Sequence, residues 1–160
     1  MKNVSVGFIG GGRIVRIFLA AWQRKDIIPE RIVISEPDSG AVAAMKKYFP
    51  DQPIVFTADH SEAARQDVVF LAVHPPVMKE ILSQIGQHIA GNSVVVSLVP
   101  KFRISMISKL LGGHARIVRM IPNAASWTNN GYNPAALAED ISATEKQMLV
   151  QLLGALGRMP

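Results

Sequence analysis

The sequence contains no cysteine. This absence excludes disulfide bonds, thiolate metal sites and cysteine nucleophiles, and it is compatible with the cytoplasmic location that we expect. Apolar runs long enough to cross a bilayer are also missing, so we expect no membrane partner. Met1 and Lys2 precede an apolar stretch, but three glycines interrupt it and no small-residue cleavage site follows. We therefore do not interpret the start of the chain as a signal peptide.

Runs of like charge are absent as well. The formal net charge is +5, yet the basic residues are scattered and do not alternate with aromatic residues, which make up 6% of the chain. We therefore expect no nucleic-acid partner, since a basic domain can equally attract a dinucleotide or an anionic substrate. Three histidines, His60, His88 and His114, lack the spacing of metal ligands. We expect no metal site and interpret these histidines as surface residues.

The sequence does contain a regular alternation of apolar runs and helical periods. The length of 160 residues and the apolar share of 49% fit one globular domain, residues 1–160, with a real core. Apolar, often β-branched runs predict strands at 4–9, 31–35, 54–56, 68–73, 94–98, 115–121 and 131–138. Helical spacing predicts helices at 14–21, 38–48, 61–65, 75–89 and 104–111, and one from the capping box Ser142–Glu145 to near Gly157.

Strands that alternate with helices predict a fold class and the place of its ligand site. The expected fold is α/β, a doubly wound and mostly parallel sheet of the Rossmann type with right-handed crossovers. Such sheets bind ligands beyond the carboxyl ends of their strands. The residues that bind a ligand are therefore expected at the points where the predicted strands end.

The first strand ends in three consecutive glycines, Gly10, Gly11 and Gly12, followed by Arg13 and Ile14. Gly10 and Gly12 fill the first two glycine places of the G-x-G-x-x-G fingerprint, and Val15 stands at the third. In such a turn the first glycine permits the tight bend, and the second leaves room for a pyrophosphate at the helix N-terminus. The motif lies between a strand and an amphipathic helix, which favours a dinucleotide site over a glycine turn without a ligand.

Ser35 and Glu36 end the second strand, about 20 residues beyond the loop, where an acid commonly binds the ribose hydroxyls of adenosine. A carboxylate there would repel a 2′-phosphate, so we favour NAD(H) over NADP(H). Ser35 and Arg13 keep NADP(H) open, because a hydroxyl and a guanidinium can hold a phosphate. An ordinary exposed carboxylate is the alternative for Glu36.

Other polar residues follow the later strands at the same predicted edge. His74 follows the fourth strand and is a weak catalytic candidate, with a simple turn residue as the alternative. Ser97 ends the fifth strand, and Asn123 follows the sixth. The Asn123 amide could bond a nicotinamide carboxamide or act in catalysis, or it could only form a turn. We interpret Trp22 as a packing residue, whereas Trp127 could cover the nicotinamide pocket or pack against a partner.

Four ordered segments of this chain resemble the N-terminal domain of pyrroline-5-carboxylate reductases and the related deazaflavin-dependent NADP oxidoreductases. They are residues 6–12, 71–82, 94–97 and 118–123, the last followed by Gly131. The resemblance implies hydride transfer from NAD(P)H to the C=N carbon of a cyclic imine, as in proline biosynthesis. It implies phosphate contacts at Gly10, Gly12, Arg13 and Ile14, and a ribose–nicotinamide wall at Ala72, Val73 and His74. Pro122 and Asn123 would flank the nicotinamide.

The chain departs from the family's pattern near the cofactor edge. Arg13-Ile14 replaces a frequent Asn-Met, His74 a usual Lys, and Pro100-Lys101 a usual Ala-Gly, while Ser35-Glu36 stands where Asn or Ser and then Arg are common. The resemblance also implies a helical C-terminal domain that builds the dimer and much of the imine pocket; residues 1–160 do not include it, so we expect either a fragment of a longer protein or a cofactor module that works alone. We therefore expect an isolated chain that binds cofactor without efficient turnover, and a parent protein that is a homodimer or larger.

Two other functions stay open at this point. The chain could be the NAD(P)-binding domain of a hydroxy-acid or deazaflavin-linked dehydrogenase. It could also be a non-enzymatic dinucleotide-binding or interaction module. The Pro100-Lys101 segment, which departs from the family's pattern, supports this alternative.

Overall fold

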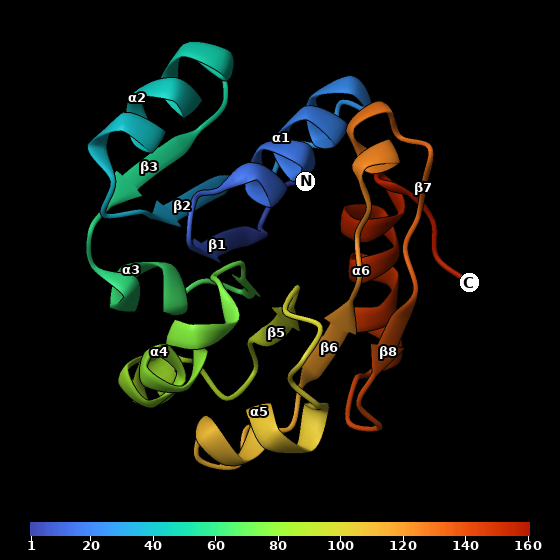
Figure 1. Ribbon diagram of the computed structural model, residues 1–160. Helices are drawn as coiled ribbons and strands as arrows, with labels where there is room; N and C mark the ends of the chain where they lie inside the picture. The colour runs from blue at the N-terminus through green and yellow to red at the C-terminus, as the bar shows by residue number, and fades with distance from the viewer.

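A seven-stranded sheet organises the chain in the computed structural model, which describes residues 1–160 (Figure 1). Its strands are β1 (Ser5–Ile9), β2 (Arg31–Ser35), β3 (Ile54–Thr57), β4 (Val68–Leu71), β5 (Val94–Ser97), β6 (Ile117–Met120) and β8 (Ala135–Leu137). They lie in the order β3-β2-β1-β4-β5-β6-β8, with the first six parallel and β8 antiparallel to β6. The order reverses between β1 and β4, which confirms the predicted doubly wound Rossmann-type α/β fold.

Helices cover both faces of the sheet. They are α1 (Arg13–Arg24), α2 (Ser39–Tyr48), α3 (His60–Ala64), α4 (Met78–Ile85), α5 (Ile104–Leu110) and α6 (Ala143–Gly154), with 3₁₀ turns η1 (Pro75–Val77), η2 (Gly86–His88) and η3 (Ala124–Thr128). A core of 25 buried residues joins the sheet to α1 and α6, and a core of 16 joins it to α3, α4 and α5. The longest helices have 12 residues, and none has the length and hydropathy of a membrane span.

Burial on both faces explains the apolar strand sequences. Every residue of β4 and β5 is buried, as expected for central strands of a parallel sheet. On the α1 side, the rings of Phe8, Phe18, Trp22 and Phe70 pack together with centroids 4.8 to 6.1 Å apart. The Trp22 indole Nε1 donates a hydrogen bond of 2.8 Å to the Leu152 carbonyl and so ties α1 to α6. Trp22 is therefore the packing residue that we predicted.

The predicted seventh strand over residues 131–138 is wrong. The segment forms two strands, β7 (Gly131–Tyr132) and β8, which belong to different sheets. Pro134 cannot donate to a ladder, and buried Asn133 turns inward, where its Oδ1 accepts from the Asn123 N–H and the Ser126 hydroxyl. The predicted end of the last helix is also corrected, because α6 ends at Gly154.

Residues beyond α6 form β9 (Gly157–Arg158), which pairs in parallel with β7. Gly157 has a φ of +137° and packs its backbone directly against that of Gly131. A Cβ at position 157 would meet the Gly131 backbone, and a Cβ at position 131 would meet the Ser126 hydroxyl and the Leu156 carbonyl, so both positions require glycine where the segment after α6 packs on the loop that carries η3.

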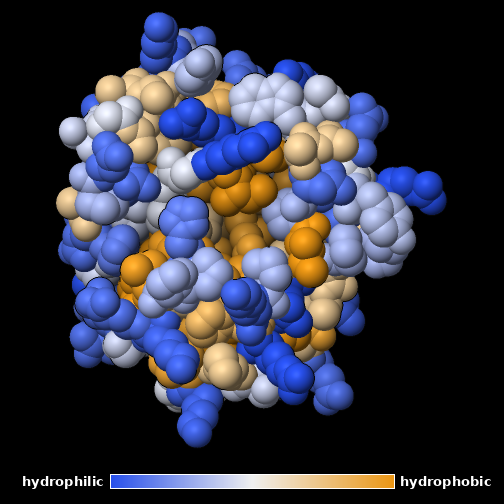
Figure 2. All heavy atoms as spheres, in the orientation of Figure 1, coloured by the Kyte–Doolittle hydropathy of each residue, from blue (hydrophilic) through white to orange (hydrophobic).

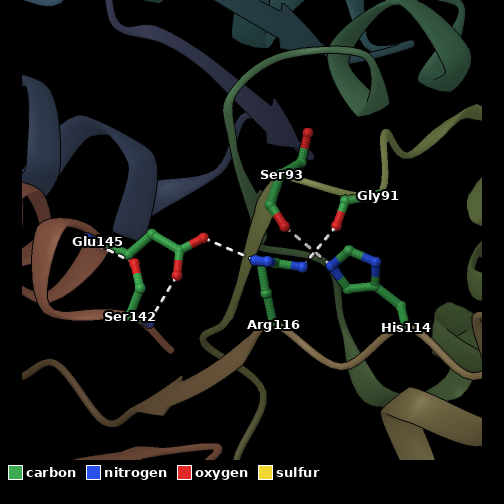
Figure 3. Close-up of polar contacts among 6 residues, drawn as sticks. All are labelled: Gly91, Ser93, His114, Arg116, Ser142 and Glu145. Atoms are coloured by element: carbon green, nitrogen blue, oxygen red, sulfur yellow. Dashed lines mark hydrogen bonds and ion pairs between the residues drawn. The ribbon is translucent and has the colours of Figure 1, made fainter. Parts of the chain in front are cut away.

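A polar network at the amino edge of the sheet anchors α6 (Figure 3). Ser142 and Glu145 form the predicted capping box, with hydrogen bonds of 2.7 and 3.2 Å. The Arg116 Nε lies 2.8 Å from Glu145 Oε1, and its Nη1 donates to the Gly91 carbonyl. Burial alone would raise the pKa of Glu145, but the hydrogen bonds from Ser142 and the Arg116 charge outweigh it and lower the pKa below its ordinary 4.5.

We predict that Glu145→Gln lowers the free energy of unfolding at neutral pH by about 0.5 to 1 kcal/mol, the range for a partly exposed ion pair. Glutamine can still bond the Ser142 N–H, so the change removes the charge alone. A carboxyl with a lowered folded pKa stabilises the protein above its unfolded pKa and loses this effect as the pH falls through the folded value. The difference from wild type should therefore shrink at acidic pH.

Urea unfolding at neutral pH, at about pH 4.5 and at about pH 3 measures this difference. Glu139→Gln serves as the matched control, because Glu139 is exposed and has no ion pair. Equal loss of stability in the two variants at neutral pH would show that the Arg116–Glu145 pair contributes nothing.

Candidate functional site

A cavity of about 650 Å³ opens at the carboxyl edge of the sheet, where a hollow with hydrophobic residues at its floor is visible near the middle of Figure 2. Residues that follow each of the six parallel strands line it. Residues 10–14 follow β1, Glu36 and Pro37 follow β2, and His60 follows β3; residues 72–74 follow β4, Leu98 and Pro100 follow β5, and Ile121 and Pro122 follow β6. The cavity therefore spans the switch point between β1 and β4, the expected ligand position in this fold.

Gly10 makes the turn that brings the chain to this position. Its φ is +100°, and its N–H donates to the Ser35 carbonyl at 2.9 Å. A Cβ at this position would lie 2.6 Å from the Ala72 carbonyl oxygen, which belongs to the backbone. Both the backbone angle and the close approach require glycine here.

Gly12 has a different role, because a Cβ at this position would meet no atom within 4 Å. Gly12 is exposed and is the N-cap residue of α1, where it offers no side chain to the first-turn N–H groups. The first turn of α1 carries no acid, and the Arg13 guanidinium has no hydrogen-bond partner in the protein. The open space therefore faces unpaired N–H groups and a cation, an arrangement that suits a bound anion such as a pyrophosphate.

Glu36 connects the end of β2 to the glycine loop. Its carboxylate accepts hydrogen bonds from the Gly11 N–H at 2.8 Å and from the Asp38 N–H at 2.9 Å. The side chain is half-buried and lines the cavity. Each carboxylate oxygen can accept more than one hydrogen bond, so Glu36 can hold the loop and still accept from a ligand hydroxyl.

His74 lies on the other side of the switch point. The side chain lines the cavity, is exposed, and makes no hydrogen bond within the protein. Ala72 and Val73 line the same wall, and the Ala72 N–H bonds to the Ile9 carbonyl at 2.9 Å. The ring nitrogens of His74 are therefore available to hydrogen-bond a ligand.

Three predicted site residues do not line the cavity. Ser35 is fully buried and bonds to His60, and the Ser97 Oγ, also buried, accepts from the Val99 N–H. Asn123 uses both ends of its amide on the backbone: Oδ1 accepts from Ala125 N–H at 3.1 Å, and Nδ2 donates to the Tyr132 carbonyl at 2.9 Å. The geometry of Asn123 is that of the turn-forming alternative, and its predicted contact with nicotinamide stays a prediction.

Several lining residues were not singled out from the sequence. They are Pro37, His60, Val77, Glu80, Ile81, Gln84, Leu98, Pro100 and Ile121. His60, His88 and His114, which we interpreted as surface residues, are each partly exposed and hydrogen-bonded, and His60 in addition lines the cavity. His60 follows β3 as Glu36 follows β2, and this position at the carboxyl edge was the signal that could have identified it.

Two features lie outside this cavity. Trp127 does not cover it: the ring is 39% exposed, faces the Arg24 guanidinium 5.8 Å from its centroid, and lines a separate hollow beside the ends of α1 and α2. Asp59 caps α3 next to His60, and hydrogen bonds from the backbone and hydroxyl of Ser61 lower the pKa of its carboxyl. No group of three or more His, Asp or Glu side chains is placed to bind a metal ion.

Comparison with known proteins identifies pyrroline-5-carboxylate reductases among the relatives of this chain. The pyrroline-5-carboxylate reductase of Escherichia coli is 29% identical over 129 residues, which cover 79% of this chain and 46% of that protein. Human pyrroline-5-carboxylate reductase 2 is 27% identical over 161 residues, which cover 96% of this chain and 49% of that protein. The chain thus spans about half the length of these relatives.

Solved structures show the same fold. A pyrroline-5-carboxylate reductase from Coxiella burnetii aligns with a TM-score of 0.88 at 25% identity, covering 99% of this chain and 58% of that one. The pyrroline carboxylate reductase of Plasmodium falciparum, solved with NADP bound, aligns with a TM-score of 0.84 at 18% identity over the whole of this chain and 58% of that one.

Residues 5–101, more than half of the chain, match the family described as NADP oxidoreductase, coenzyme F420-dependent. This match includes the glycine loop, Glu36, His60 and the wall formed by residues 72–74. The chain is therefore a member of the F420-dependent NADP oxidoreductase family, with the Rossmann-type fold of the pyrroline-5-carboxylate reductases.

Proposed function

We propose that this chain is the NAD(P)H-binding domain of an oxidoreductase of the pyrroline-5-carboxylate reductase type. The observation that carries the proposal is the open space in front of Gly12, at the uncapped N-terminus of α1 and inside a cavity at the switch point. The relatives are pyrroline-5-carboxylate reductases, and this likeness together with the geometry favours reduction of a cyclic imine. A bound dihydronicotinamide would supply the hydride for the C=N carbon.

The two ends of the cavity suit the two halves of a dinucleotide. The end beside β2 and β3 carries Glu36 and His60, which can hydrogen-bond a ribose and an adenine. The end beside β5 and β6 is formed by Leu98, Pro100, Ile121 and Pro122, which suit the flat face of a nicotinamide. Between the two ends, α1 and Arg13 would hold the pyrophosphate.

We infer that NAD(H) binds in preference to NADP(H). The support is the Glu36 carboxylate at the end of β2. The 2′-phosphate of NADP(H) would bring a negative charge close to this carboxylate, and the two would repel each other. The Plasmodium falciparum relative was solved with NADP, so the preference is a property that we propose for this sequence and not for the family.

The proposal also covers the substrate, assembly and location of the whole protein. We infer a small-molecule imine as substrate, a homodimer or larger assembly for the parent protein, and a cytoplasmic location. These follow the expectations from the sequence, and size-exclusion chromatography and cell fractionation of the full-length protein test them.

A deazaflavin-linked oxidoreductase is the second candidate, and the description of the matched family favours it. Such an enzyme exchanges hydride between NADP(H) and the deazaflavin, so it needs a site for the 2′-phosphate. Preference for NADH in a direct titration would disfavour this candidate.

The central prediction concerns Gly12→Val. Its branched side chain would occupy the space in front of α1, while the N-cap φ of −84° and ψ of −160° suit a β-branched residue. We expect the affinity for NADH to fall by about 100-fold or more, with a thermal midpoint within about 3 °C of wild type. Fluorescence titration with NADH and thermal unfolding are the two measurements.

Two other glycines supply the controls for this variant. Gly91→Val adds the same atoms at an equally open position at the other edge of the sheet, so it should leave NADH affinity unchanged. Gly10→Ala should instead destabilise the fold by about 2 kcal/mol, because of the positive φ and the contact with Ala72. NADH affinity in Gly12→Val equal to that of wild type would contradict the proposed site.

A second prediction tests the cofactor preference. Wild-type protein should bind NADH about tenfold or more tightly than NADPH at about pH 8, and Glu36→Gln should reduce this ratio. Glutamine keeps an oxygen that can accept from the Gly11 N–H, so the loop should stay in place. Comparable wild-type affinities for the two cofactors would overturn the assignment.

A third prediction concerns turnover by the 160-residue chain itself. Beside β5 and β6 the cavity lining has no charged side chain, so no lining residue there can bind the carboxylate of pyrroline-5-carboxylate. We expect NADH binding without efficient imine reduction, measured as NADH oxidation with pyrroline-5-carboxylate present. Robust turnover would show that the chain already contains a complete substrate site.

A further inference from the structure

His60 occupies a position that joins the buried sheet to the cavity. It follows β3 as the first residue of α3, and its half-buried ring lines the cavity. Its Nδ1 lies 2.8 Å from the Oγ of Ser35, a fully buried side chain at the end of β2. The Ser35 Oγ also lies 3.3 Å from the Phe8 carbonyl oxygen in β1.

Two arrangements of the Ser35 hydroxyl proton fit these contacts. If the hydroxyl donates to the Phe8 carbonyl, the Ser35 oxygen accepts from Nδ1–H of His60, and Nε2, which has no hydrogen-bond partner in the protein, is unprotonated in the neutral ring. If the hydroxyl donates to an unprotonated Nδ1, Nε2 carries the proton instead. We infer the first arrangement, because in it both contacts of the Ser35 hydroxyl are hydrogen bonds.

The charged groups around His60 are mostly acidic. Glu36 from the end of β2 and Glu80 from α4 line the same cavity, and Asp59 and Glu62 lie on either side in α3. Behind the ring, Arg65 and His88 lie beside a smaller cavity that also includes His60 and Gln84. Arg13 also lines the main cavity and is a permanent cation, and His60 is the lining residue beyond β3 whose charge can change.

We propose that His60 determines cofactor specificity through its charge state; this inference rests on the proposed dinucleotide function. With Nε2 unprotonated, the ring accepts a hydrogen bond from a ribose hydroxyl and favours NAD(H). With Nε2 protonated, the ring donates a charge-assisted hydrogen bond to a 2′-phosphate and offsets the Glu36 carboxylate. The preference for NAD(H) is therefore weaker when the His60 ring is charged than when it is neutral.

The test measures affinities for NADH and NADPH at about pH 8 and about pH 5.5, in wild type and in His60→Gln. 5′-AMP and 2′,5′-ADP provide a second pair of probes that differ only in the 2′-phosphate. We expect the NADPH-to-NADH affinity ratio of wild type to rise about tenfold between the two pH values, and that of His60→Gln to change less than about twofold. The phosphate itself gains a proton near pH 6, and comparison with the variant removes this contribution.

His114→Gln is the matched control, since His114 bonds to the Ser93 carbonyl at the amino edge of the sheet (Figure 3). It should respond to pH as wild type does. If the wild-type ratio does not change with pH, or if His60→Gln shifts as wild type does, the inference is overturned. If neither nucleotide binds to wild type at either pH, the proposed function fails instead.

A second measurement needs no substitution in the site. Nitrogen-15 NMR of the imidazole rings, assigned with His60→Gln, reports which nitrogen is protonated at about pH 8. The Nδ1–H tautomer of neutral His60 is expected. An Nε2–H tautomer would contradict the hydrogen-bond assignment and with it the mechanism.

Discussion

The close approach of Gly10 to the Ala72 carbonyl is the constraint on which the site depends. Because position 10 has no Cβ, the chain can leave β1 at a φ of +100° and turn against the end of β4. This turn places the N-terminus of α1 at the switch point of the sheet. Glu36 then holds the Gly11 N–H from the end of β2, so three neighbouring strands determine the geometry of one loop.

The order of the strands divides the cavity chemically. The side near β2 and β3 has carboxylates and an imidazole, whereas the side near β5 and β6 has prolines and aliphatic side chains. A nicotinamide dinucleotide has a polar adenosine half and a flat nicotinamide ring. A cavity with one polar end and one apolar end suits these two halves. His74 follows β4, which lies in the sheet between the strands of the two ends. In the proposed function the chain would supply mainly binding and orientation.

The sequence predicted the features that depend on local pattern. Continuous apolar runs identified the central strands, and the glycine loop and Glu36 were identifiable because each follows a strand at a known interval. Whether a polar side chain near that edge faces the cavity depends on its tertiary partners. Asn123 uses its amide on the backbone, and Ser97 is buried.

Other features depend on contacts between segments far apart in the sequence. His60 gains its role from Ser35, 25 residues earlier, and the split between β7 and β8 follows from the inward turn of Asn133 and the crossing of Gly131 and Gly157. Glu80 and Gln84 lie on α4, and the spacing of apolar residues in this helix predicted which face is buried. Which of its polar residues line the cavity depends on how α4 packs beside α3, and the sequence does not show this packing.

Backbone amide NMR of the chain during titration with NADH tests the central claim most directly. If the pyrophosphate binds in front of Gly12, the largest shifts should appear at the N–H groups of Gly12, Arg13 and Ile14, which begin α1. Smaller shifts should follow at Glu36 and at residues 72–74. Shifts confined to another surface, with the amides of residues 12–14 unchanged at saturation, would contradict the account.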